Sequence, residues 1–178
     1  SQERMLIPQR ITSFALNQPP GQTNVFLLGQ KGMYQWELSG GFKKGINAGR
    51  WCEQSCIMVL YRPKGKYKPH GVTFKMPLPG LSEKHPIKLT VNIQAYKGKS
   101  SDHYLKDLAK QILNTKIPES ATSKEYIFSN PENFYPLPVK FKKHQLWLIS
   151  LKTDRAIVPK EHDPTSTDSR KLGVRVLF

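Results

Sequence analysis

Apolar and polar residues alternate along much of this chain, which is the pattern of β-strands with one buried face. The clearest example is 87–96, where Ile87, Leu89 and Val91 alternate with polar side chains. Shorter apolar segments predict further strands at 25–28, 33–38, 57–61, 72–76, 126–128, 146–151 and 172–178, with another ending at Val158. The segment 135–141 contains two prolines, which favours an edge strand.

One stretch has helical spacing instead. Leu105, Leu108 and Ile112 recur on one helical face after a Ser-Ser-Asp sequence that can cap a helix. We predict a helix over 102–113, with a strand over 111–117 as the alternative for its last part. Eight or nine short strands with at most one short helix indicate a mainly β protein, specifically a β-sandwich of jelly-roll type.

The chain is long enough for one domain with a substantial core, at 178 residues. Residues 1–24 are polar and contain several prolines, so we expect an N-terminal arm or a short edge strand there. Residues 25–178 are predicted to form a single β-sandwich domain. Within it, the sequence Gly29-Gln30-Lys31-Gly32 predicts a turn between the first two strands.

The chain is strongly basic. It has 28 Lys and Arg against 13 Asp and Glu, a formal net charge of +15. This excess favours an anionic partner: an anionic glycan, a phosphorylated envelope component, an acidic protein, a membrane surface or a nucleic acid. Nucleic acid is the least favoured of these, because the basic residues are spread along the chain and form no dense block. No run of about 18 apolar residues is present, so no membrane-spanning helix is predicted.

Two cysteines, Cys52 and Cys56, are separated by three residues. As zinc ligands they would need two more Cys or His nearby, and the five histidines are isolated along the chain. If 53–55 forms a tight turn, the two thiols face each other across a hairpin and can form a disulfide. A disulfide would place the protein in an oxidising compartment, and two buried thiols would indicate a reducing one.

No arrangement of catalytic residues is apparent. The sequence has no G-x-S-x-G motif around a nucleophile, no Gly-rich phosphate loop and no obvious pair of carboxylates for glycoside hydrolysis. We therefore expect no enzymatic activity, no metal and no cofactor.

Two polar segments are candidate sites. In the first, Lys64, Lys66 and Lys68 surround Tyr67, and such a basic-aromatic loop can bind an anionic sugar or a nucleic acid. The alternative is a solvated loop without a ligand. In the second, Asp168 and Arg170 lie in the loop before the last strand, where their side chains can hydrogen-bond loop backbone and fasten the loop.

A series of short motifs resembles a bacterial envelope family, the jelly-roll, carbohydrate-binding-like domains attached to membrane glycosyltransferases and phosphoglycerol transferases. The motifs lie between residues 30 and 178: Gly32 and Glu37, Gly49-Arg50-Trp51, Met76-Pro77-Leu78-Pro79, 87–91, Ala95-Tyr96, Val158-Pro159 and Asp168-Ser169-Arg170-Lys171-Leu172-Gly173-Val174. The resemblance implies that Glu37, Trp51 and Arg170 form a buried structural cluster, with Asp168 beside them.

Three classes of function are consistent with these observations. The first is a non-enzymatic binding or accessory module of the bacterial cell envelope, periplasmic or extracellular, that recognises an anionic glycan, a lipid head group or a protein partner. The second is a periplasmic inhibitor or immunity-type protein that binds an acidic protein. The third is a nucleic-acid binder, whose affinity would fall steeply with salt.

Overall fold

The computed structural model describes residues 18–19, 25–39, 47–62, 71–97, 102–117, 119, 121–140 and 145–178. Its strands are β1 (Phe26–Ser39), β2 (Asn47–Tyr61), β3 (Thr73–Lys75), β4 (Ile87–Lys97), β5 (Thr122–Phe128), β6 (Phe134–Pro136), β7 (Gln145–Thr153) and β8 (Arg175–Leu177). Its helices are α2 (Asp102–Leu113) and the single turn α3 (Pro159–His162). The predicted helix over 102–113 is confirmed, and the alternative strand over 111–117 is not formed.

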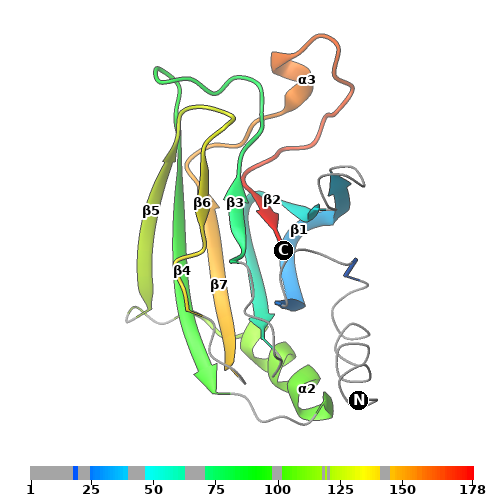
Figure 1. Ribbon diagram of the computed structural model, residues 1–178, viewed down its shortest axis with the longest axis vertical. Coiled ribbons are helices and arrows are strands. Elements are labelled where there is room, and N and C mark those ends of the chain that lie inside the picture. The colour runs from blue at the N-terminus through cyan, green and yellow to red at the C-terminus, as the bar shows by residue number, and fades with distance from the viewer. Residues whose placement is uncertain are drawn as a thin grey trace.

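Eight strands form one antiparallel sheet in the order β5-β4-β7-β2-β8-β3-β6, with β1 paired to β2 (Figure 1). The long strand β2 belongs to both halves of this sheet. Its residues 55–61 pair with β7, and its residues 49–51 pair with β8. The prediction of a mainly β fold with eight or nine strands and one short helix is confirmed, in an antiparallel sheet whose form is that of a sandwich or a barrel.

The two ends of the sheet, β5 and β6, approach each other and nearly close it. The hydroxyl of Tyr135 on β6 donates a hydrogen bond to the carbonyl oxygen of Ile127 on β5, at 2.6 Å. The ring of Tyr135 also lies 4.9 Å from that of Tyr126 and 5.1 Å from that of Phe128. Aromatic packing therefore seals the gap where strand pairing ends, and the predicted edge position of β6 is confirmed.

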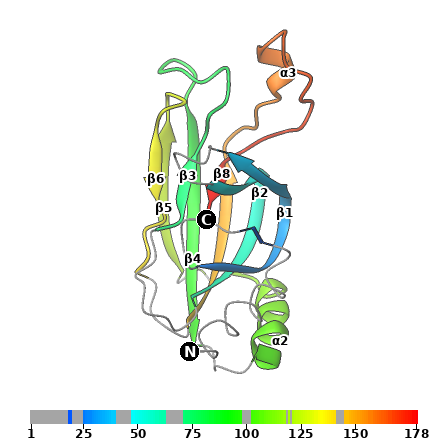
Figure 2. The same cartoon turned by 45° about the vertical axis from the view of Figure 1, so that its right-hand side comes forward.

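Two apolar cores hold the fold together. The larger core lies between the sheet halves and contains inward-facing residues such as Phe74, Phe128 and Val176. The smaller core lies between α2 and the outer face of β2 and β7, where Leu105 and Ile112 of the helix pack on Leu148. Figures 1 and 2 both show α2 at one end of the sheet and α3 at the opposite end.

β2 bends at the point where its pairing changes from β7 to β8. Opposite this bend, Gly32 alone on β1 faces the bulged residues 53–56 of β2, because Lys31 pairs with Ile57 and Met33 pairs with Cys52. A disulfide between Cys52 and Cys56 closes the bulge, so that prediction is confirmed. The predicted hairpin is wrong, because the chain keeps its direction through the bend and β2 continues as one strand.

The predicted turn at 29–32 is also wrong, since β1 runs through it as one strand. Gly32 does adopt a positive φ of 81°, but it accommodates the bulge and does not reverse the chain. A Cβ atom at Gly32 would lie 2.6 Å from the carbonyl oxygen of Ser55. On the other side of the bulge, a Cβ atom at Gly173 would lie 2.5 Å from the carbonyl oxygen of Glu53. Two glycines thus allow the backbone to pack tightly on both sides of the disulfide-closed bend.

The last part of the chain differs from the prediction of two strands joined by a loop. Only the second strand forms, as β8, and the apolar segment ending at Val158 contributes a single bridge between Ile157 and Leu172. The loop between them contains α3 and is held by a hydrogen bond from the Lys160 amide to the Asp168 carbonyl. This backbone hydrogen bond holds the loop in a defined conformation up to Arg170.

Candidate functional site

Four residues from the neighbouring strands β2, β8, β3 and β6 are aligned by strand pairing into a row. Trp51 pairs with Arg175, Arg175 pairs with Lys75, and Lys75 pairs with Phe134. Directly paired residues of antiparallel strands point to the same face of a sheet. Val176 and Phe74 are fully buried, so their neighbours Arg175 and Lys75 lie on the outer face, whereas Trp51 is buried among the residues of the larger core. We call these four residues the cation–aromatic row.

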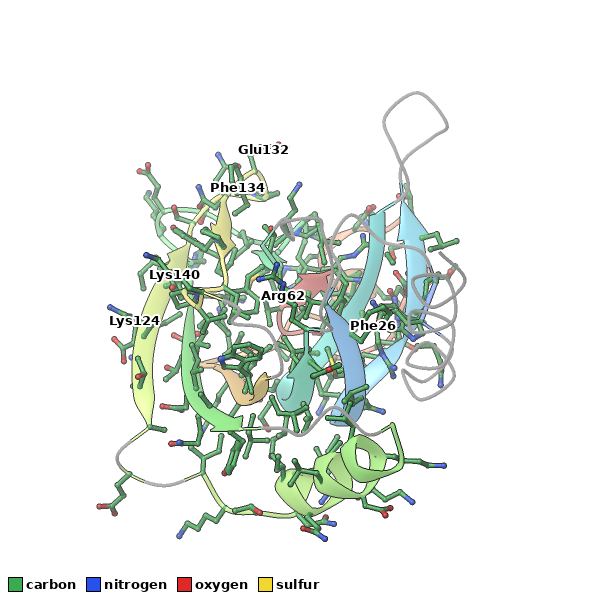
Figure 3. The ribbon with its side chains drawn as sticks, turned by 60° about the horizontal axis from the view of Figure 1, so that its bottom comes forward. Phe26, Arg62, Lys124, Glu132, Phe134 and Lys140 are labelled. Atoms are coloured by element: carbon green, nitrogen blue, oxygen red, sulfur yellow. A yellow bond between two sulfur atoms is a disulfide. The ribbon has the colours of Figure 1, made fainter. Side chains whose placement is uncertain are left out.

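Each cation of the row lies over an aromatic ring. The Arg175 guanidinium carbon is 6.0 Å from the centre of the Trp51 ring, and the Lys75 ammonium is 5.9 Å from that of Phe134. Such contacts contribute about 0.5–1 kcal/mol when exposed. The two rings differ in access, because Trp51 is only 5 % exposed and Phe134 is 63 % exposed. Phe134 projects from β6 beside Glu132 (Figure 3). The buried Trp51 ring can therefore hold the Arg175 guanidinium in position, and the exposed Phe134 ring is accessible to a ligand.

Lys75 and Arg175 are direct partners in the β3–β8 register, and their charged groups lie over the Phe134 ring on β6 and the Trp51 ring on β2. Like charges in this position destabilise a strand pair, which makes the arrangement unusual for a purely structural surface. Arg175 lies over Gly49, where a Cβ atom would be 2.7 Å from its Nε. Burial lowers the pKa of Arg175, and the negative charge of Glu37 opposes this fall. An anion bound between Lys75 and Arg175 would be attracted by both positive charges.

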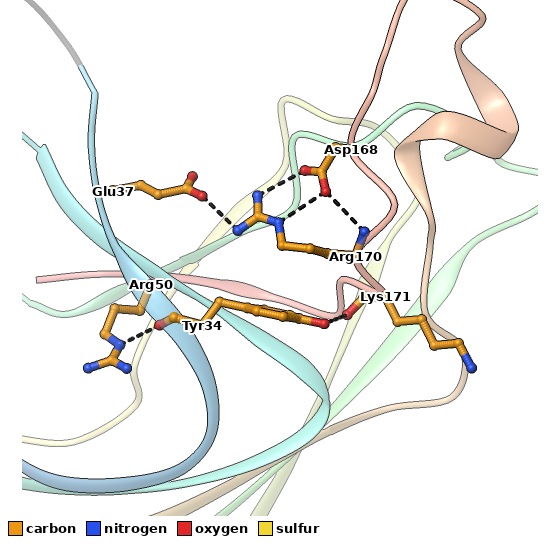
Figure 4. A network of polar contacts seen from close by, with 6 residues as sticks. All are labelled: Tyr34, Glu37, Arg50, Asp168, Arg170 and Lys171. Carbon is orange, nitrogen blue, oxygen red and sulfur yellow. Dashed lines mark hydrogen bonds and ion pairs between the residues drawn. The ribbon is translucent and has the colours of Figure 1, made fainter.

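A network of ion pairs borders the row. Arg170 donates from Nε and Nη2 to the two carboxylate oxygens of Asp168, at 3.0 and 2.8 Å, and from Nη1 to Glu37, at 2.8 Å (Figure 4). The Arg170 guanidinium also lies 5.2 Å from the ring centre of Tyr34. The hydrogen bonds from Arg170 lower the pKa of Asp168, and the bonds to both carboxylates raise the pKa of Arg170.

The structure brings Glu37, Asp168 and Arg170 together, but it corrects the expected burial. The side chains of Arg170 and Glu37 are 32 % and 37 % exposed, so the ion pair is half-exposed. Trp51 is buried as expected, but the cation on its ring is Arg175, whereas Arg170 lies over Tyr34. Trp51 contacts Arg175 and not Arg170 because the strand register pairs Trp51 with Arg175. The network therefore fastens the loop before β8 at the surface.

Arg50 is a buried arginine in this region, with the whole residue 3 % exposed. Its Nε donates a 2.6 Å hydrogen bond to the carbonyl oxygen of Tyr34, and the group lies 5.4 Å from the ring centre of Trp36. Burial lowers the pKa of Arg50. Arg50 faces β1 backbone where the register of β1 shifts between Met33 and Trp36, so its role is to support the strand.

The candidate ligand loop with Lys64, Lys66, Tyr67 and Lys68 lies outside the described residues. Within the part of the chain that the structure describes, no group of three His, Cys, Asp or Glu side chains could hold a metal ion. The described helices also include none that is long and apolar enough to cross a bilayer.

Sequence analysis missed the cation–aromatic row, although part of its signal was present. Inward alternation at Val174, Val176 and Phe178 places Arg175 on the outer face, and buried Phe74 does the same for Lys75. The missing information was which strands pair, because the members of the row are far apart in sequence.

No protein-family model matches this sequence, and no curated protein matches it. Function must therefore be inferred from the surface of the protein itself.

Proposed function

We propose that this protein is a non-catalytic binding module of the bacterial cell envelope that binds an anionic glycan on its cation–aromatic row. One observation carries the proposal: Lys75 and Arg175 are direct partners on the adjacent strands β3 and β8, and the exposed ring of Phe134 lies next to Lys75. The row places two positive charges and one accessible aromatic face along a single line. This combination suits a sugar that carries a carboxylate or a phosphate.

The two parts of such a ligand have separate places in the row. The acidic group would lie between Lys75 and Arg175, where both positive charges attract it and it accepts charge-assisted hydrogen bonds. The apolar face of the sugar ring would pack on Phe134, whose ring is the most exposed in the row. Trp51 and Gly49 act indirectly, because the first supports the Arg175 guanidinium and the second leaves room for it.

The location outside the cytoplasm is part of the proposal, and the disulfide supports it. Bonds of this kind persist in oxidising compartments such as the bacterial periplasm and are rare in the cytosol. The Cys52–Cys56 bond closes the bend of β2 from which Trp51 enters the row. Loss of the bond in a reducing compartment would loosen the strand that supports the proposed site.

The test compares binding of a polygalacturonate oligosaccharide with binding of neutral dextran by isothermal titration calorimetry. Lys75→Gln should weaken polygalacturonate binding at least about tenfold, since a hydrogen bond to a charged group contributes about 1.5–3 kcal/mol. Phe134→Ser should weaken it as well. Lys152→Gln is the matched control, because Lys152 is an exposed strand lysine on the other half of the sheet. The control should bind within about twofold of wild type.

Two results would overturn the proposal. The first is a wild-type protein that binds polygalacturonate no better than dextran. The second is equal binding by Lys75→Gln and Lys152→Gln, which would show that the total charge of the protein, and no particular site, is responsible.

A further inference from the structure

Glu37 lies between two guanidinium groups at the end of the cation–aromatic row. On one side it accepts a 2.8 Å hydrogen bond from Arg170. On the other side its cross-strand neighbour is Gly49, and the Arg175 guanidinium lies directly over Gly49. Because directly paired residues share a face, the carboxylate of Glu37 stands next to Arg175. Glu37 is thus an internal counter-ion of the site.

Asp168 differs from Glu37 although both pair with Arg170. Both carboxylate oxygens of Asp168 are occupied by Arg170, and one of them also accepts the Arg170 backbone amide. The negative charge of Asp168 is therefore largely balanced by Arg170 itself. Glu37 receives only one nitrogen of Arg170, and its charge also acts on Arg175.

We propose that Glu37 determines the charge specificity of the site, so that it accepts sparsely charged anionic glycans and discriminates against dense polyanions. This inference rests on the proposed function. Lys75, Arg175 and Arg170 supply three positive charges in and beside the row, and Glu37 and Asp168 reduce the local sum to one. A site with a local net charge of one attracts a ligand segment that carries one acidic group. Without Glu37 the sum would be two, which favours ligands that present several charges close together.

The experiment uses two variants that remove the same charge at different places, Glu37→Gln and Asp168→Asn. Each raises the net charge of the protein by one and keeps the shape of the side chain. Binding is measured with a hyaluronan oligosaccharide, which has one carboxylate per two sugars, and with a heparin oligosaccharide of equal length, which is densely sulfated. Each titration is repeated over a series of salt concentrations, and thermal melting verifies that each variant is folded.

Glu37→Gln should tighten heparin binding roughly tenfold at low salt and steepen its salt dependence by about one unit, as expected for one additional effective cation. Its affinity for hyaluronan should rise by about threefold or less. Asp168→Asn should stay within about twofold of wild type for both ligands, because the cation that it leaves less balanced, Arg170, lies over Tyr34 beside the row and still bonds to Glu37. Glu37→Asp, which keeps the charge, should retain the wild-type preference.

Equal changes in Glu37→Gln and Asp168→Asn would overturn the inference and leave the proposed function intact. If the wild type binds neither saccharide and binds polygalacturonate no better than dextran, the proposed function fails, and a second measurement still tests Glu37. On a sulfonate cation-exchange resin, Glu37→Gln should elute at higher salt than Asp168→Asn, because the first variant removes the carboxylate beside Arg175 in the row, whereas the second leaves Arg170 still bonded to Glu37. Equal elution of the two variants would overturn the role of Glu37 independently of any glycan.

Discussion

The two halves of the outer sheet face are composed in opposite ways. On β2 and β7 the outer residues include Val59, Leu146 and Leu148, and these are apolar and lie under α2. On β8 and β3 the outer residues Arg175 and Lys75 are cationic, and they lie in a row that ends in an exposed aromatic ring. The first half contributes to stability because its apolar area is removed from water. The second half places two cations on directly paired residues, an arrangement that does not favour strand pairing and so departs from what stability alone would select.

The comparison also shows why the bend in β2 matters. The same strand supplies Val59 to the apolar half and Trp51 to the cationic half, and the disulfide-closed bulge lies between them. Changes on the apolar half should alter stability alone, changes in the row should alter binding alone, and changes at the bend should alter both.

The largest effect is expected on the apolar half. Leu148→Ala removes a fully buried side chain that packs under α2. We expect the free energy of unfolding to fall by about 3 kcal/mol, from lost burial and the cavity left behind. Urea denaturation measures this fall, and polygalacturonate affinity at a temperature where the variant is folded should match wild type. A binding defect in the folded variant would contradict the separation of the two halves.

The next effect is expected at the bend. Gly32→Ala places a Cβ at a positive φ and 2.6 Å from the carbonyl oxygen of Ser55. We expect a loss of about 2–3 kcal/mol, because the backbone conformation alone disfavours alanine by 1–2 kcal/mol. Gly71→Ala is the control, since a Cβ there meets nothing within 4 Å. Equal melting temperatures for the two variants would show that the bend tolerates a side chain at Gly32.

Removal of the disulfide should have a somewhat smaller effect. Replacing both Cys52 and Cys56 with alanine opens a loop of only a few residues, for which the chain-entropy account gives about 2 kcal/mol. The loosened bend should also weaken polygalacturonate binding, because Trp51 adjoins Cys52 and supports Arg175. Unreduced wild-type protein should show no reactive thiol when titrated in denaturant. Detection of two thiols would refute the bond itself.

The smallest effect is expected at the ion-pair network, and it depends on pH. Hydrogen bonds from Arg170 keep the pKa of Asp168 below its unfolded value, so the folded state binds a proton less tightly than the unfolded state. The resulting stability is present above the unfolded pKa of about 4 and is lost as the pH falls through the lower, folded pKa. The side chain is 28 % exposed, so the contribution should be about 0.5–1 kcal/mol.

Urea titrations between about pH 5 and pH 2 should therefore show a shallower loss of stability in Asp168→Asn than in wild type. Identical pH profiles would mean that the network does not form in solution. By the same reasoning, Arg170→Ala and Glu37→Ala should each cost at most about 1 kcal/mol, in place of the larger cost expected of a buried pair.

The sequence was sufficient where local pattern determines structure. The alternation over 87–96 became β4, and the helical spacing after Ser101 became α2. The spacing of Cys52 and Cys56 predicted their bond, although the hairpin that was expected to bring them together is a bulge within one strand. Glycine at position 32 is compatible with either a turn or a bulge, and only the facing strand decides between them.

The site was less accessible to sequence analysis for a different reason. Arg170, Asp168 and Glu37 were identified together through a resemblance, but their exposure depends on how the loop lies on β1. The row of Trp51, Arg175, Lys75 and Phe134 follows from strand register alone. The pairing register of strands that are far apart in the sequence depends on the whole fold, so it cannot be predicted from a local motif.

The position of β8 in the sheet bears on the order in which the protein can fold. β8 lies between β2 and β3, so β3 and its neighbour β6 have no strand connecting them to β2 until residues 175–177 are in place. Contacts between β2 and β8 join parts of the chain that are more than a hundred residues apart in sequence. Such long-range pairing slows folding, and we expect insertion of β8 to be the late, rate-limiting step on a millisecond-to-second scale. Until then the edge of β2 at 49–51 is an open template for another strand, so the nascent chain is most vulnerable to mispairing at the strand that later supports the row.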